Sequence, residues 1–151
     1  DPRDDLTGAD VIRKLLILAR ECGVPLEAEQ VAVQKLLPDG IRLTETLEDF
    51  YEELQIADDY FSDLVSGAQA EGKVLRYITL IEGDRARVSL EKVGPDHPFF
   101  GLTGSDNIFS FRTEHYNEQP LVVRGPGAGA NVTAAGVFAA LLRTISPLSA
   151  R

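Results

Sequence analysis

The first residues of the chain include carboxylates and a lysine ammonium group, spaced so that the lysine could take part in proton transfer. Asp10 and Lys14 are four residues apart, so on a helix they share one face. A lysine whose surroundings lower its pKa can exchange a proton with a hydroxyl or carbonyl oxygen. Asp4 or Asp5 could then hold the ammonium group of a substrate while Asp10 orients Lys14. The pattern indicates acid–base chemistry on a small polar molecule.

These residues also have a purely structural interpretation. Acids near the start of a helix favour its positive dipole end. An exposed Asp–Lys pair at this spacing contributes only about 0.3–0.5 kcal/mol to stability. Such pairs are ordinary on helix surfaces, so spacing alone favours the structural interpretation of Asp10 and Lys14 and leaves the chemical one open.

A second candidate is the glycine-rich run RGPGAGANVT at residues 124–133, between a predicted strand and a predicted helix. Backbone amides at such a helix start can face an anion or a cofactor. A tight strand-to-helix turn produces the same pattern. Neither a Rossmann fingerprint nor a Walker lysine is present in the run.

Histidine and cysteine suggest no metal site. His97 and His115 have no second His or Cys at ligand spacing, and we expect both to be structural or exposed. Cys22 is the single cysteine, so it cannot form an internal disulfide, and we expect it to be a packing residue.

Apolar residues at helical intervals predict the helices that hold these candidates. The first spans residues 8–22, with Thr7 and Asp10 as a capping pair and Gly23 as terminator. One long or two consecutive amphipathic helices are expected over residues 46–71. A final helix that is apolar nearly all round is expected over residues 132–145.

Runs with strand-forming residues and turn signals predict about five strands. Residues 74–81 and 86–90 flank Gly83-Asp84 and predict a hairpin. Three more strands are expected over residues 31–36, 107–112 and 120–124.

Composition narrows the class of protein. The 151 residues, 44% hydrophobic and 26% charged, are typical of one globular domain spanning 1–151. The net charge of −9 repels phosphate backbones and anionic lipid, so we expect no nucleic-acid and no membrane partner. No apolar run reaches the ~18–20 residues of a membrane span, and no signal peptide is visible, so a cytoplasmic location is predicted. The sequence contains no methionine, and we interpret it as a fragment of a longer protein.

Two long segments resemble hallmark stretches of the homoserine dehydrogenases: DPRDDLTGADVIRKLLILAR at residues 1–20 and RGPGAGANVTAAGVFAALLR at residues 124–143. The intervening EGKVLRYI, VGPDHPFF and SDNIFSF are also similar to this family, especially to the bacterial enzymes fused to an aspartate kinase. The resemblance covers nearly the whole chain. It implies an oxidoreductase that interconverts aspartate semialdehyde and homoserine with NAD or NADP, on the route to threonine and methionine.

The resemblance also implies roles for particular residues. Lys14 would be the proton donor to the aldehyde oxygen, and Asp10 would contact the substrate and position Lys14. Asp5 would help to bind the polar end of the substrate. Gly129, together with Gly127, would contact the cofactor. The family's substrate-binding glutamate and its Rossmann glycines have no counterpart in this sequence, so the chain by itself is expected to be inactive.

We therefore expect an α+β domain with a mixed sheet of about five strands and helices on one face. The final helix would return to a Rossmann domain outside the chain, and an exposed sheet face or edge could form a homodimer. The alternatives are a non-catalytic small-molecule-binding or dimerisation module and an anion-binding regulatory domain that uses the glycine loop. The choice between NAD and NADP stays open, because the residues that read the ribose belong to a Rossmann domain.

Overall fold

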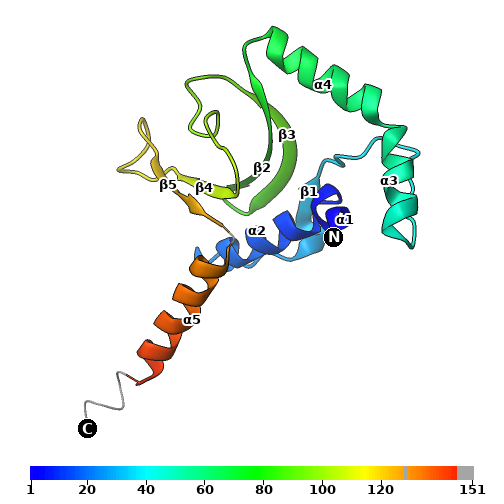
Figure 1. The fold of residues 1–151 in the computed structure, drawn as a ribbon. Coiled ribbons are helices and arrows are strands. Elements are labelled where there is room, and N and C mark those ends of the chain that lie inside the picture. The colour runs from blue at the N-terminus through cyan, green and yellow to red at the C-terminus, as the bar shows by residue number, and fades with distance from the viewer. Residues whose placement is uncertain (128, 146–151) are drawn as a thin grey trace. The chain divides into compact units, whose positions relative to one another are not determined.

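The computed structural model describes residues 1–127 and 129–145 and divides the chain into two compact units, Asp1–Pro95 and Asp96–Arg151. Both units combine helices with strands (Figure 1), which confirms the α+β class expected from the sequence. No helix in the described ranges has the length and apolar character needed to cross a bilayer.

The first unit begins with two helices, α1 (Pro2–Leu6) and α2 (Ala9–Glu21). The short helix α1 forms because the Asp1 carboxylate accepts a hydrogen bond from the Arg3 amide at 3.0 Å, and because proline fits the first turn of a helix. α2 confirms the first predicted helix. Gly23 follows its end with a φ of +80°, as expected of a helix terminator.

The predicted capping of α2 by Thr7 is wrong. The Thr7 hydroxyl donates to the Arg3 carbonyl at 2.7 Å, and Thr7 is the C-cap of α1. The N-cap of α2 is Gly8, which has a φ of +81° and no side chain to cap with. The capping pattern does not reveal that the residues before Thr7 form a helix of their own. Thr7 ends that helix, so its hydroxyl bonds to α1 and not to α2.

A three-stranded sheet forms the centre of the first unit. Its strands are β1 (Val31–Val33), β2 (Val74–Glu82) and β3 (Arg85–Val93), in the order β1-β3-β2. β2 and β3 are the predicted antiparallel hairpin, whereas β1, shorter than predicted, pairs with β3 in parallel. A turn of 3₁₀ helix, η1 (Ala28–Gln30), precedes β1.

α2 packs its apolar face on this sheet. Leu15 and Ala19, four residues apart, are both buried, so one stripe of α2 faces the core. The core cluster joins residues of α2, of β1 and β3, and of the connection after α2: Leu15, Ala19, Leu26, Val31, Ala86 and Val88. Cys22, expected to pack, is exposed instead, because it lies past the last turn of α2 where the chain turns at Gly23.

Residues 46–71 form two helices, which decides between the two alternatives. α3 (Leu47–Gln55) starts where the Thr46 hydroxyl accepts a hydrogen bond from the Asp49 amide at 3.2 Å. α4 (Asp58–Ala70) starts after the buried Ala57. The break contains neither proline nor glycine, so no strong sequence signal marks it.

Glu71, at the end of α4, ties this helix to the sheet. Its carboxylate accepts hydrogen bonds from Lys73 at 2.8 Å and from Lys92 of β3 at 2.6 Å. Hydrogen bonds and charge from these two lysines lower the pKa of Glu71 to about 2.

The depressed pKa of Glu71 predicts acid-sensitive stability. A carboxylate whose pKa is lower in the folded state stabilises the fold above its unfolded pKa, and this contribution is lost as the pH falls. We expect the stabilisation to disappear between about pH 4.5 and about pH 2. In urea unfolding, Glu71→Gln should lower the midpoint at pH 6 and lower it clearly less at pH 2.5. The exposed Glu52 of α3 provides the control, since Glu52→Gln should change neither midpoint; an equal loss for Glu71→Gln at both pH values would contradict the assignment.

The second unit contains a hairpin and a helix. β4 (Asp106–Phe111) and β5 (Leu121–Pro126) pair antiparallel, and α5 (Ala130–Ile145) confirms the final predicted helix. Several large apolar side chains of α5 are exposed, among them Val137 and Phe138.

The five predicted strands are all present, but in the described residues they form two sheets rather than one. β1, β3 and β2 make the first sheet, and β4 bonds to β5 in the second. Alternation of apolar and polar residues identifies a strand without identifying its partner, because pairing is decided in three dimensions.

Candidate functional site

Asp10 and Lys14 form an ion pair on the accessible side of α2. Asp10 Oδ2 lies 2.7 Å from Lys14 Nζ, at the i and i+4 positions of one helix. The Lys14 side chain is 54% exposed and that of Asp10 is 36% exposed. The sheet holds the opposite stripe of α2, so the ammonium group is presented to solvent on a fixed helix. The predicted pair is confirmed as a contact, and a small molecule can reach it.

Asp5 lies on α1, one turn before the pair. Its backbone carbonyl accepts a hydrogen bond from the Gly8 amide at 3.1 Å, which links α1 to the start of α2. Its side chain is exposed and forms no hydrogen bond or ion pair with the described residues. A carboxylate without a partner in the protein can bind an ammonium group.

Arg3 anchors α1, a function that the sequence did not predict. Its guanidinium donates to the carbonyl oxygens of Thr44 at 2.6 Å and Glu45 at 3.1 Å, in the segment that leads into α3. Arg3 Nε also donates to the Asp1 carboxylate at 2.9 Å. These contacts hold the helix that carries Asp5. No local pattern could reveal them, since Arg3 and Thr44 are 41 residues apart.

Gly127 and Gly129 lie in the second unit, between β5 and α5. The Gly127 amide donates to the Ser105 carbonyl at 2.9 Å, and a Cβ at Gly127 would overlap the side-chain amide of Asn107. Gly129 has a φ of +137°, and its carbonyl accepts the first hydrogen bond of α5, from the Thr133 amide at 3.0 Å. No described atom outside the neighbouring residues lies within 4 Å of a Cβ built at Gly129. Ala128, between the two glycines, lies outside the described residues.

The structure thus places the predicted residues in two groups. Asp5, Asp10 and Lys14 belong to the first unit and lie on consecutive helices. Gly127 and Gly129 belong to the second unit. A common site formed by both groups stays a prediction.

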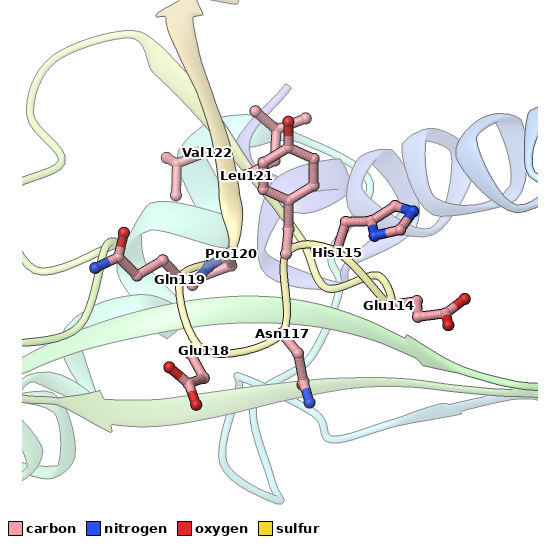
Figure 2. A pocket seen from close by; sticks show the side chains of 9 residues that line it. Glu114, His115, Asn117, Glu118, Gln119, Pro120, Leu121 and Val122 are labelled. Atoms are coloured by element: carbon pink, nitrogen blue, oxygen red, sulfur yellow. The ribbon is translucent and has the colours of Figure 1, made fainter.

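Two surface hollows are lined by other residues. Residues 114–120 of the connection between β4 and β5, with Leu121 and Val122 of β5, line the hollow in Figure 2, and His115 is among them. The second hollow adjoins α3, where the buried Glu53 accepts a hydrogen bond from Arg42 Nε at 3.0 Å, and this bond lowers the pKa of Glu53. In the described part of the chain, no group of three His, Cys, Asp or Glu side chains could hold a metal ion.

Comparison with known proteins shows the family to which the chain belongs. The family model of homoserine dehydrogenase matches residues 1–142. The chain belongs to the homoserine dehydrogenase family. The match contains the whole first segment, with Asp5, Asp10 and Lys14, and all but the last residue of the second, with both loop glycines.

Individual relatives agree with this membership. The chain is 48% identical over 145 residues to bifunctional aspartokinase/homoserine dehydrogenase 1, chloroplastic, of Arabidopsis thaliana; this covers 95% of the chain and 16% of the relative. It is 42% identical to homoserine dehydrogenase of Paracoccidioides brasiliensis, covering 98% of the chain and 41% of the relative. A solved structure of a protein of unknown function from Candida auris superposes with a TM-score of 0.84 at 42% identity, covering 97% of the chain and 41% of that protein. The chain thus spans less than half the length of each of these three proteins.

Proposed function

We propose that this chain is the substrate-binding and catalytic part of a homoserine dehydrogenase, which reversibly reduces L-aspartate 4-semialdehyde to L-homoserine with NADH or NADPH. The observation that carries the proposal is the ion pair of Asp10 and Lys14, at 2.7 Å on an accessible helix face, in a chain of this family. The uncommitted carboxylate of Asp5 on the preceding helix supports it.

Lys14 is the proton-transferring group in this proposal. Reduction of the aldehyde builds negative charge on its oxygen, and a proton from Lys14 Nζ neutralises that charge to give the hydroxyl of homoserine. The neutral amine then regains a proton from solvent, and oxidation of homoserine follows the reverse path. Asp10 holds Lys14 Nζ by the 2.7 Å contact and, with Asp5, binds the ammonium group of the substrate.

The nicotinamide cofactor supplies the hydride when it is bound. Gly129 fits a role in holding it, because the space beside its Cα is open and residues with a side chain rarely adopt its φ of +137°. Gly127 has a further reason to be glycine, since Asn107 occupies the space of a Cβ there. We infer that both contact the cofactor and that the residues that distinguish NADP from NAD lie in a separate nucleotide-binding domain.

Activity in this proposal requires a longer protein. The chain covers 16% of the bifunctional plant relative and 41% of the fungal one, so most of each relative lies outside the matched part. We propose that a nucleotide-binding domain completes the site, that the isolated chain is inactive, and that the enzyme is a cytoplasmic homodimer.

One observation favours a second candidate function. Leu121 and Val123, which share one face of β5, are both exposed apolar side chains, a pattern typical of an interaction surface. A dimerisation or small-molecule-binding module without catalysis is therefore the alternative.

Oxidation of homoserine separates the two candidates. We expect the full-length protein that carries this segment to reduce NAD or NADP in the presence of L-homoserine, and the 151-residue chain to show no turnover. The rate is followed as the formation of reduced nicotinamide. Omission of homoserine is the control for background reduction. No turnover by the full-length protein would contradict the proposed function and favour the non-catalytic module.

A further inference from the structure

The junction between α1 and α2 rests on a side chain from the sheet. Gly8 forms this junction, is buried and has a φ of +81°. A Cβ at Gly8 would lie 3.0 Å from the hydroxyl oxygen of Tyr77 on β2 and 3.6 Å from its ring atom Cε1. The Tyr77 side chain therefore lies directly against the backbone of Gly8, and a side chain at Gly8 would press on it.

The Tyr77 hydroxyl is itself fixed to the sheet. It donates to the Gln34 carbonyl at 2.8 Å, directly after β1. Gln34 is bound twice to β3, since its amide donates to the Val88 carbonyl at 2.8 Å and its side-chain oxygen accepts from the Leu90 amide at 3.0 Å. Burial raises the pKa of Tyr77, so the phenol keeps the proton that it donates. All three strands of the first sheet thus support the α1–α2 junction.

The junction separates the residues of the proposed site. Asp5 lies before Gly8 on α1, and Asp10 and Lys14 lie after it on α2. The pair of Asp10 and Lys14 is internal to one helix, so it survives a change in the angle between the helices. The position of Asp5 relative to Lys14 changes with that angle.

We propose that Tyr77 is a positioning residue whose hydroxyl, held by the Gln34 carbonyl, fixes the α1–α2 junction at Gly8 and so sets Asp5 relative to Lys14. This inference rests on the proposed function, in which Asp5 binds the substrate and Lys14 transfers the proton. Loss of the contact weakens substrate binding more than it slows proton transfer, because it moves Asp5 and leaves the lysine pair intact.

The test is Tyr77→Phe in the full-length protein that carries this segment, with homoserine oxidation at saturating cofactor. The KM for homoserine should rise about 3- to 10-fold, the effect of one lost hydrogen bond. The kcat should change less than about 2-fold, and its pH profile should stay the same. The matched control is Tyr51→Phe, which removes the hydroxyl of an exposed tyrosine on α3 and should leave KM unchanged. An unchanged KM in Tyr77→Phe, or equal losses in kcat and in binding, overturns the proposal.

A double variant tests whether Tyr77 acts through Gly8. Gly8→Ala should also raise KM, because the new methyl group meets the Tyr77 hydroxyl and the φ of +81° becomes strained. Phenylalanine at position 77 removes the atom nearest to that methyl group. The KM of Gly8→Ala/Tyr77→Phe should therefore rise by less than the product of the two single increases. A rise equal to the product means that the two residues act independently, which contradicts the proposal.

Amide hydrogen exchange on the same protein separates this inference from the proposed function. Tyr77→Phe should speed exchange at Thr7 and Gly8, whose amides donate to the carbonyls of Arg3 and Asp5, and leave Cys22 at the far end of α2 unchanged. If the wild type does not oxidise homoserine, the proposed function is wrong, and exchange alone decides whether Tyr77 anchors the junction. Unchanged exchange at Thr7 and Gly8 overturns the anchoring.

Discussion

Lys14→Ala in the full-length protein should lower kcat for homoserine oxidation by about 10²–10⁴-fold, the usual contribution of a positioned acid or base. Alanine removes the ammonium group that Asp10 holds at 2.7 Å and leaves the buried stripe of α2 untouched, since Lys14 is exposed. Cofactor affinity should stay nearly unchanged, because the loop glycines are in another part of the chain. The measurement is the steady-state rate with homoserine and with cofactor varied separately.

One further variant shows whether the Lys14 ammonium group acts as a proton donor or only as a positive charge. Lys14→Arg keeps the positive charge, but arginine does not release a proton in the accessible pH range, so kcat should stay low. Lys35→Ala is the matched control, because Lys35 and Asp39 are another exposed i,i+4 pair, with Nζ and Oδ1 3.8 Å apart. An unchanged kcat in Lys14→Ala would remove Lys14 from the mechanism, whereas full activity in Lys14→Arg would leave it an electrostatic role.

Gly129→Ala should raise the KM for the nicotinamide cofactor by about 10-fold or more. A residue with a Cβ at a φ of +137° costs about 1–3 kcal/mol, so the loop should leave the conformation that offers its backbone to the cofactor. The same strain acts at the start of α5, because the Gly129 carbonyl accepts from the Thr133 amide. Cofactor KM and direct cofactor binding to the full-length protein measure the effect.

The control for this variant is Gly136→Ala, within α5. Its Cβ would meet no described atom within 4 Å, and alanine is favoured over glycine in a helix by about 1 kcal/mol. We expect cofactor KM to be unchanged and the fold to be slightly more stable. If Gly129→Ala and Gly136→Ala have the same cofactor KM as the wild type, the loop is a tight turn and not a cofactor contact.

Local sequence patterns were sufficient to predict the helices, the hairpin turn and the pair of Asp10 and Lys14. The apolar spacing of α2 and α5 and the turn at Gly83 predict their elements, because each depends on residues within a few positions of one another. The same holds for Asp10 and Lys14: an i,i+4 spacing on a helix brings the two side chains together whatever the rest of the chain does.

The contacts that hold the candidate site in place depend on residues far apart in the sequence. Arg3 reaches carbonyls 41 and 42 residues away, and Tyr77 reaches the Gln34 carbonyl 43 residues away. None of these contacts leaves a local pattern. Local patterns also did not predict that the five strands divide between two sheets, or that Thr7 caps α1 and not α2. Partners far apart in the sequence are chosen by packing in three dimensions, whereas the patterns that can be read along a chain are set by neighbouring residues.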